Sequence, residues 1–152
     1  EVNLAMPYHV VDVVSQALSQ EGEVLAGARV LIVGVAFKRD VDDARNSPAE
    51  RIIELLLRRG ADVCYSDPYV ARYRVGRDVF FPEERWLEHV ELSDEVLAAV
   101  DCAVIVAGHR AIDYNRLLRS ASLVVDTDNS TRGLTGTARV VRIGAPLSMQ
   151  RE

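Results

Sequence analysis

The sequence predicts an α/β protein: a Rossmann-like, doubly wound, mainly parallel sheet with helices on both faces, preceded by an N-terminal helix. Strand-like apolar runs alternate with helical patterns along the chain, which is typical of this class. The run at 29–35 is almost continuously apolar, as expected of a strand that is covered on both faces. Residues 28–66 also have the length of one β-α-β unit.

The individual elements follow from hydrophobic periodicity and from helix-capping residues. Residues 6–20 predict a helix, and Pro7 is tolerable there because it falls in the first turn. Ser47 and Pro48 predict the start of a second helix, which Gly60 ends. The remaining expectations are strands at 61–65, 102–107, 123–126 and 139–143, helices at 93–99 and 113–120, and an irregular connection at 70–92.

Composition and charge exclude several classes of protein. The 152 residues fit one domain, and the net charge of −5 argues against general affinity for nucleic acid. No apolar run approaches the ~20 residues that span a membrane. The chain begins with neither Met nor a secretory signal, so we expect a fragment of a longer protein. Cys64 and Cys102 lie in expected strands without metal-ligand spacing, which predicts buried thiols, no metal site and a cytoplasmic location.

Charged side chains follow the first strand, at the edge where a parallel sheet binds its ligands. Lys38 and Arg45 precede the second helix, a combination that suits a diphosphate, and Phe37 offers an apolar wall for a base or sugar. Alternatively, Phe37 packs inward and the cations pair with the aspartates at 40–43. A dinucleotide held by this turn alone is disfavoured, because Ala36 replaces the glycine that lets a pyrophosphate approach.

Two later loops should lie at the same edge of the sheet. His109 is either an acid or base for chemistry or a residue that hydrogen-bonds locally. Asp126, Asp128, Asn129 and Arg132 follow the next strand. These four residues either cap and turn the chain or line the same pocket from its other side.

Read together, these segments resemble the C-terminal domain of the UDP-glucose/GDP-mannose dehydrogenase family. The resemblance rests on AMPYHVVDVV at 5–14, GVAFKRDVDDARNSPAERIIELLLRRGADV at 34–63, SDPYV at 66–70 and VVDTDN at 124–129. It covers most of the chain, and the long middle block is highly specific. The family oxidises the 6-hydroxymethyl group of a nucleotide sugar to a carboxylate, with two NAD and a cysteine thiohemiacetal.

The resemblance implies roles for particular residues and segments. Phe37 and Lys38 would contact the nucleotide sugar, a UDP-sugar, and Arg45 would reach the NAD pyrophosphate across an interdomain cleft. Residues 1–22 would be the tail of the central linking and dimerisation helix. Residues 23–152 would then form the UDP-binding domain.

The sequence departs from the family in two respects. The dinucleotide fingerprint and the segment with the nucleophilic cysteine are absent, so we expect no catalytic residue in this chain and no activity from it alone. Many relatives carry arginine at the position of Asp128; the contact is lost here, or Arg132 replaces it in binding substrate. A truncated linking helix also predicts an exposed apolar stripe, formed by Val10, Val14 and Leu18.

We therefore interpret the chain as the nucleotide-sugar-binding domain of an NAD-dependent UDP-sugar 6-dehydrogenase of the UDP-N-acetylhexosamine branch. An N-terminal domain of the same enzyme would bind most of the NAD. The full-length protein would be a cytoplasmic homodimer in polysaccharide biosynthesis. Alternatives are a fragment of a GDP-mannose dehydrogenase, and a stand-alone nucleotide-binding or regulatory module without catalysis.

Overall fold

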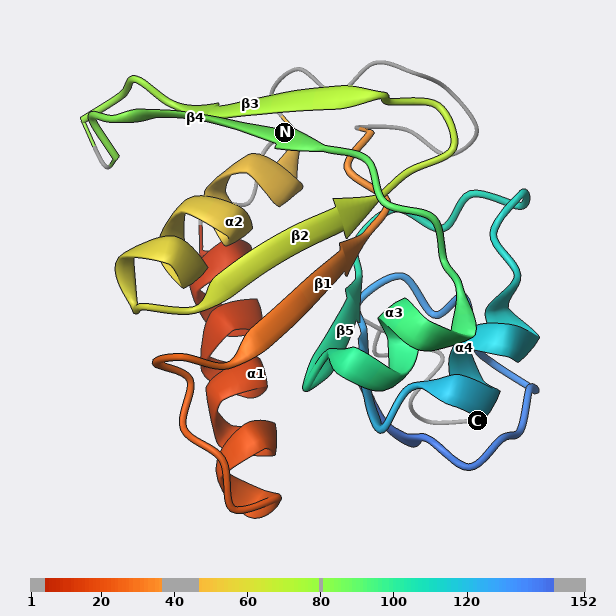
Figure 1. Cartoon of the computed structure of the whole chain (residues 1–152). Helices are drawn as coiled ribbons and strands as arrows, with labels where there is room; N and C mark the ends of the chain where they lie inside the picture. The colour runs from red at the N-terminus through yellow and green to blue at the C-terminus, as the bar shows by residue number, and fades with distance from the viewer. Residues whose placement is uncertain (1–4, 37–46, 80, 144–152) are drawn as a thin grey trace.

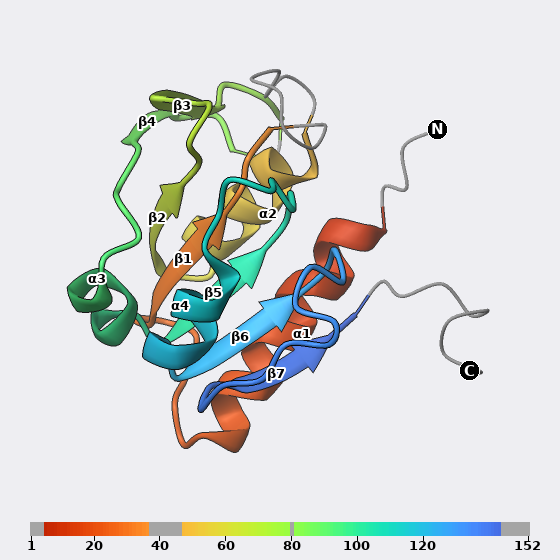
Figure 2. The same ribbon diagram turned by 90° about the vertical axis from the view of Figure 1, so that its right-hand side faces the viewer.

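A computed structural model of the chain describes residues 5–36, 47–79 and 81–143. Its centre is a five-stranded sheet in the order β2-β1-β5-β6-β7, in which every neighbouring pair is parallel (β2, β1 and β5 are labelled in Figure 1, and all five strands in Figure 2). The strands are β1 (Arg29–Val33), β2 (Asp62–Ser66), β5 (Cys102–Ile105), β6 (Leu123–Asp126) and β7 (Arg139–Arg142). The predicted doubly wound parallel sheet is confirmed, and its strand order reverses between β1 and β5.

Helices cover both faces of this sheet. α1 (Met6–Gln20) and α2 (Pro48–Arg58) pack on one face, and α3 (Asp94–Ala99) and α4 (Tyr114–Ser120) pack on the other (Figure 2). Alternate residues of β1 point to opposite faces, as the pleat of a strand requires. Val30 and Ile32 therefore join the core beneath α1 and α2, whereas Leu31 and Val33 join the core beneath α3 and α4.

Side-chain caps explain why α2 and α3 begin where the sequence predicts. Ser47 Oγ accepts a hydrogen bond from the backbone N–H of Ala49, 3.1 Å away, at the start of α2. Ser93 Oγ accepts from Val96 N at the start of α3 in the same way. Such bonds satisfy donors that the first helical turn leaves unpaired. Among the described residues, no helix has the length and apolarity needed to cross a membrane.

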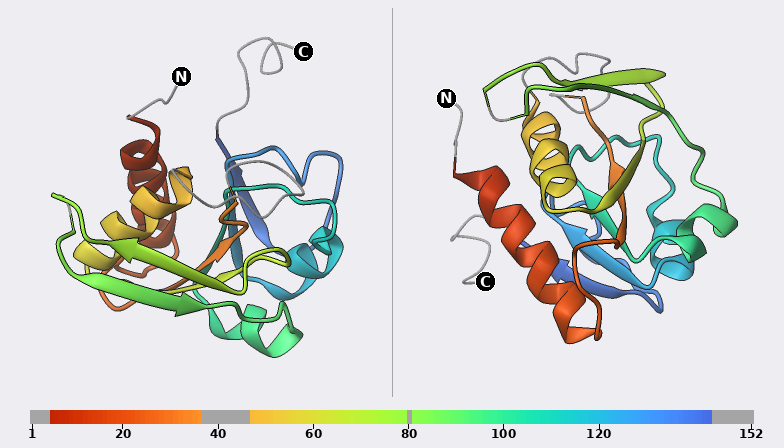
Figure 3. Two further views of the ribbon diagram at one scale, coloured as in Figure 1. Left: turned by 90° about the horizontal axis from the view of Figure 1, so that it is seen from above. Right: turned by 60° about the vertical axis from the view of Figure 1, so that its left-hand side comes forward.

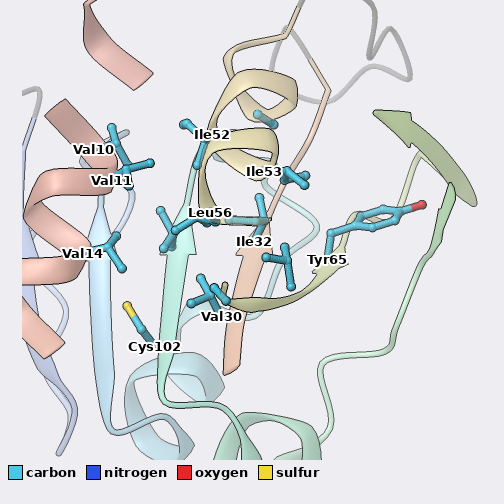
Figure 4. Close-up of a cluster of buried hydrophobic side chains, with 14 of the residues drawn as sticks. Val10, Val11, Val14, Val30, Ile32, Ile52, Ile53, Leu56, Tyr65 and Cys102 are labelled. Atoms are coloured by element: carbon cyan, nitrogen blue, oxygen red, sulfur yellow. The ribbon is translucent and has the colours of Figure 1, made fainter. Parts of the chain in front are cut away.

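The apolar stripe of α1 is buried, and the expectation that it lies exposed is wrong. Val10, Val14 and Leu18 have no exposed surface. They belong to the core that α1 shares with α2 and the central strands, as Figure 4 shows for Val10 and Val14. The stripe packs within this chain, so it needs no partner to cover it. The division of the chain into residues 1–22 and 23–152 stays a prediction.

Residues 70–92 contain a β-hairpin, so the expected irregular connection there is wrong. β3 (Arg72–Gly76) pairs antiparallel with β4 (Glu84–Glu88), and the hairpin packs on α2 beside β2 (Figure 3). Tyr73 and Val75 are buried while Arg72 and Arg74 are exposed, which is the alternation of a half-buried strand.

Candidate functional site

The candidate site is the sheet edge at which β1, β2, β5 and β6 all end. Parallel sheets bind ligands at this edge, at the point where the strand order reverses. Gly34, directly after β1, has φ +84° and donates its N–H to Ser66 O at 2.8 Å. A Cβ at this position would collide with the backbone carbonyl of Ala107, after β5. Gly34 therefore allows three strand ends to meet closely.

Asp67, directly after β2, holds the neighbouring loops together. Its Oδ2 accepts hydrogen bonds from the backbone N–H of Val35 at 2.8 Å and of Ala36 at 3.1 Å. His109 Nε2 lies 2.9 Å from the same oxygen, and Oδ1 accepts from Tyr69 N at 2.8 Å. Asp67 is buried, so one carboxylate satisfies donors from the loops after β1, β2 and β5.

The structure favours the hydrogen-bonding interpretation of His109 over an acid–base role. The residue has no exposed surface, and its partner Asp67 stands 42 positions earlier in the chain. The ring of Tyr69 packs edge-on against the imidazole, with centroids 4.9 Å apart. Tyr114 donates its hydroxyl to His109 O at 2.8 Å. His109 is thus enclosed by protein and offers no face to a ligand.

The loop after β6 is shaped by Asp126 in a comparable way. Asp126 Oδ1 accepts from Asp128 N at 3.0 Å and from Ser130 N at 3.2 Å. Its Oδ2 accepts from both N and Oγ1 of Thr131, at 2.8 and 2.6 Å. Asn129 completes the turn with φ +63°. Asp126 therefore caps and turns the chain, one of the two alternatives that the sequence leaves open.

Asp128 and Arg132 occupy different positions within this loop. Asp128 Oδ2 accepts from Ser130 Oγ at 2.9 Å, and a Cβ on Gly108 would collide with both side chains. The loops after β5 and β6 thus pack closely here. Arg132 is exposed and donates its N–H to Asn129 O at 3.3 Å. Its role as a substrate contact stays a prediction.

Phe37, Lys38 and Arg45, the other predicted contacts, lie outside the described residues. The structure does place both ends of the segment that carries them. Ala36 is buried and bonded to Asp67, and Ser47 is buried as the cap of α2. The two flanking residues, Ala36 and Ser47, therefore lie at the sheet edge and at the start of α2.

The first turn does not fit an NAD pyrophosphate. Such a turn binds phosphate with free backbone N–H groups, but those of Val35 and Ala36 already donate to the carboxylate of Asp67. The negative charge of that carboxylate also opposes a pyrophosphate at the same place.

The two cysteines are unpaired and lack the environment of a nucleophile. Burial raises the pKa of the Cys102 thiol to about 12, and burial likewise raises the pKa of the Cys64 thiol. A reactive cysteine has a lowered pKa, because the thiolate is the attacking species. Both residues lie in strands, as the sequence predicts; Cys102 is buried, whereas the expectation that Cys64 is buried is wrong, because it is only half-buried.

An acidic cluster lies beneath the hairpin rather than at the candidate site. It consists of Glu50, Glu54 and Asp78. Glu54 accepts from Gly76 N at 2.8 Å, and Arg51 Nε lies 3.1 Å from its other oxygen. Burial raises the pKa of Glu54 to about 7, with Asp78 acting in the same direction. The cluster therefore fastens β3 to α2.

Sequence reasoning recognised the segment that contains Asp67 but did not identify its role. The sequence places Asp67 and Tyr69 in the segment SDPYV, directly after an expected strand, without indicating a role for either. The available signal was an aspartate at a strand end on the ligand-binding edge, the same position that Asp126 has after β6. The partner His109 carries no such signal, because it is distant in sequence.

Comparisons with known proteins agree with the fold and with the resemblance. A model of the UDP-glucose/GDP-mannose dehydrogenase family, UDP binding domain, matches residues 31–133. A UDP-N-acetyl-D-mannosamine dehydrogenase of Methanocaldococcus jannaschii is 31% identical over 137 residues, which are 85% of this chain and 28% of that protein. An NDP-N-acetyl-D-galactosaminuronic acid dehydrogenase of Ralstonia nicotianae is 28% identical, over 92% of this chain and 30% of that protein.

Solved structures give the same fold. An NDP-N-acetyl-D-galactosaminuronic acid dehydrogenase from Methanosarcina mazei Go1 matches with TM-score 0.63 and 27% identity, over 92% of this chain and 30% of the other. A UDP-D-ManNAc dehydrogenase from Pyrococcus horikoshii matches with TM-score 0.73 at 24% identity, over 93% of this chain and 31% of the other. The chain thus spans less than a third of the length of each of these proteins.

Proposed function

The chain belongs to the UDP-glucose/GDP-mannose dehydrogenase family through its UDP binding domain, and we propose that it forms the UDP-sugar-binding part of an NAD-dependent UDP-sugar 6-dehydrogenase. The observation that carries this proposal is the family match over residues 31–133. It begins in β1 and extends through the loops after β1, β2, β5 and β6, at the edge where a parallel sheet binds ligands.

The hydrogen bonds at this edge support diphosphate contacts made by side chains and not by the described backbone N–H groups at 35–36 and 130–131. The backbone N–H groups of Val35 and Ala36 are engaged by Asp67. Those of Ser130 and Thr131 are engaged by Asp126. These occupied N–H groups support phosphate contacts made by side-chain cations, through charge-assisted hydrogen bonds. Lys38 and Arg132 take this role in the proposal.

The other parts of the reaction lie elsewhere in the proposed enzyme. Phe37 contacts the nucleotide sugar, and Arg45 reaches toward the NAD pyrophosphate. A separate N-terminal domain holds most of the NAD and supplies the cysteine nucleophile. NAD, if bound by that domain, would supply the hydride acceptor for oxidation of the sugar alcohol, and this chain binds and orients the sugar nucleotide. The full-length protein is a cytoplasmic homodimer, and this chain alone is inactive.

Replacing Lys38 tests the proposal directly. We expect Lys38→Ala to weaken UDP binding by about ten- to a hundredfold, because a charge-assisted hydrogen bond contributes roughly 1.5–3 kcal/mol. NMR shift titration with UDP measures this even at millimolar affinity. Arg39→Ala is the matched control, since it removes the same charge from the next position. Equal, small losses in the two variants would show that Lys38 is not a specific contact.

One further titration and one activity assay test the alternatives. Tighter binding of GDP than of UDP by the unmodified chain would favour a GDP-mannose dehydrogenase. NADH formation from a UDP-sugar and NAD by the chain alone, abolished by Cys64→Ser or Cys102→Ser, would contradict the proposed division of labour. We expect tighter UDP binding and no NADH formation.

A further inference from the structure

We propose that Asp67 and His109 form a positioning pair for the UDP-sugar site, an inference that rests on the proposed function. Asp67 fixes the backbone from which the predicted substrate contacts extend, and His109 fixes Asp67. Neither residue touches the ligand in this proposal. Their effect on UDP binding is transmitted through the backbone of Val35 and Ala36.

The pair joins the loops of three adjacent strands at one atom. Asp67 Oδ2 accepts from Val35 N, from Ala36 N and from His109 Nε2, at 2.8, 3.1 and 2.9 Å. An ionised carboxylate oxygen can only accept hydrogen bonds, so the imidazole nitrogen that faces it, Nε2, carries the hydrogen. The orientation of the ring thereby determines where the carboxylate lies.

Burial makes these bonds consequential. Asp67 is 1% exposed and His109 has no exposed surface, so bulk water does not compete for these hydrogen bonds in the intact site. Removing the imidazole donor leaves the Asp67 carboxylate with fewer partners in a dry site, and the carboxylate must shift or admit water. Either response moves the acceptor to which Val35 and Ala36 are bound.

The chain itself connects this shift to the ligand. Phe37 and Lys38 are the two residues that follow Ala36. Binding groups must be held to within about 0.5 Å of their productive geometry. A displaced Ala36 therefore changes where both predicted contacts begin, although the substituted residue is buried and remote from UDP.

A matched pair of variants at position 109 tests the mechanism by rescue. His109→Gln can keep an N–H donor toward Asp67, whereas His109→Leu removes it. We expect NMR titration with UDP to give a roughly tenfold weaker affinity for His109→Leu and a change of less than about threefold for His109→Gln. Amide exchange at Val35 and Ala36 should accelerate in His109→Leu only.

Two further variants distinguish a positioning role from a general loss of stability. Leu97→Ala removes a buried side chain of α3, which takes no part in the strand-end loops, so it should lower stability and leave UDP affinity unchanged. If His109→Leu does not fold, Asp67→Asn replaces it. The carboxamide keeps the shape of Asp67 but turns an N–H₂ group toward one of the donors, so it should also weaken UDP binding about tenfold.

The outcomes separate the two proposals. If the unmodified chain does not bind UDP, the proposed function is wrong, and the positioning role of Asp67 and His109 is then wrong as well. If the unmodified chain binds UDP and the variants at 67 and 109 bind it equally well, only the positioning pair is wrong. A loss of affinity that follows loss of stability in Leu97→Ala and His109→Leu alike also overturns it.

Discussion

Gly34 illustrates how one residue can have the expected position and a different purpose. A glycine after the first strand usually allows a phosphate to approach the backbone. Here the space above its Cα is filled by the backbone carbonyl of Ala107, and the next two N–H groups donate to Asp67. Gly34 therefore allows two loops to pack closely and does not open the backbone to a ligand. Any ligand contact in this loop falls to the side chains that follow.

Replacing Gly34 by alanine should therefore be unusually destabilising. We expect Gly34→Ala to cost more than about 2 kcal/mol, because alanine at positive φ costs roughly 1–2 kcal/mol and its Cβ also collides with Ala107 O. Gly22→Ala is the control: φ is +80° there, and a Cβ would meet nothing within 4 Å. Urea unfolding followed by circular dichroism measures both, and equal losses would refute the role of the collision.

At this scale the sequence predicts residues whose signals are local and misses those whose partners are distant. Ser47 was recognisable as a cap because its acceptor and donor lie two residues apart. The bond between Asp67 and His109 spans 42 positions, and no pattern in a single sequence links them. The role of Asp67 became visible only once the strand ends had been brought together.

Among the elements, the β3–β4 hairpin is the one that the sequence does not predict. It is held to α2 by a buried carboxyl group, which is an uncommon arrangement. Its exposed arginines, Arg72 and Arg74, obscured the alternation with Tyr73 and Val75. The helices were predictable because their caps and periodicity are internal to each segment. The hairpin instead depends on a buried carboxyl of another element, Glu54 of α2, which accepts from Gly76 N.

This attachment should make the stability of the chain depend on pH. Burial and Asp78 raise the pKa of Glu54 to about 7, from an ordinary value of 4.5, and burial also raises the pKa of Glu50. Between these values the folded state binds more protons than the unfolded state, so stability is greatest at the acidic end and falls as pH rises. The ion pair with Arg51 favours the charged form but does not reverse this direction.

Glu54→Gln should flatten the profile between about pH 5 and pH 8. Glutamine stays neutral throughout this range and can still accept from Gly76 N. Urea midpoints at several pH values measure the effect, with Glu88→Gln as a control that removes an exposed carboxyl from the same hairpin. Parallel profiles for the unmodified chain and Glu54→Gln would show that Glu54 does not govern the dependence.

On the scale of the whole molecule, the sequence predicts the parallel sheet. It does not predict that α1 packs its apolar stripe into the core of the same chain. Apolar strands alternating with helices determine the class without long-range information. The periodicity of α1 shows which face is apolar. It does not show whether this face packs against the same chain or against another protein. The structure places Val10, Val14 and Leu18 in the common core. Arg139 of β7 further holds the end of α1, donating to Glu21 Oε2 at 2.9 Å.

The last prediction follows from that integration and concerns a chain shortened to residues 23–152. Four large apolar residues of α1 are buried, namely Val10, Val11, Val14 and Leu18. Each contributes roughly 1.5–3 kcal/mol by burial, so together they approach the ~5–15 kcal/mol by which a typical domain is stable. We expect the shortened chain to lose cooperative unfolding and the dispersed NMR spectrum of a folded protein. Two point variants give the graded version: Leu18→Ala should cost about 2–5 kcal/mol, whereas Tyr8→Ala, at a position 47% exposed, should change stability by less than about 0.5 kcal/mol. A shortened chain that unfolds cooperatively at the same urea concentration as the full chain would show instead that residues 23–152 are a domain on their own.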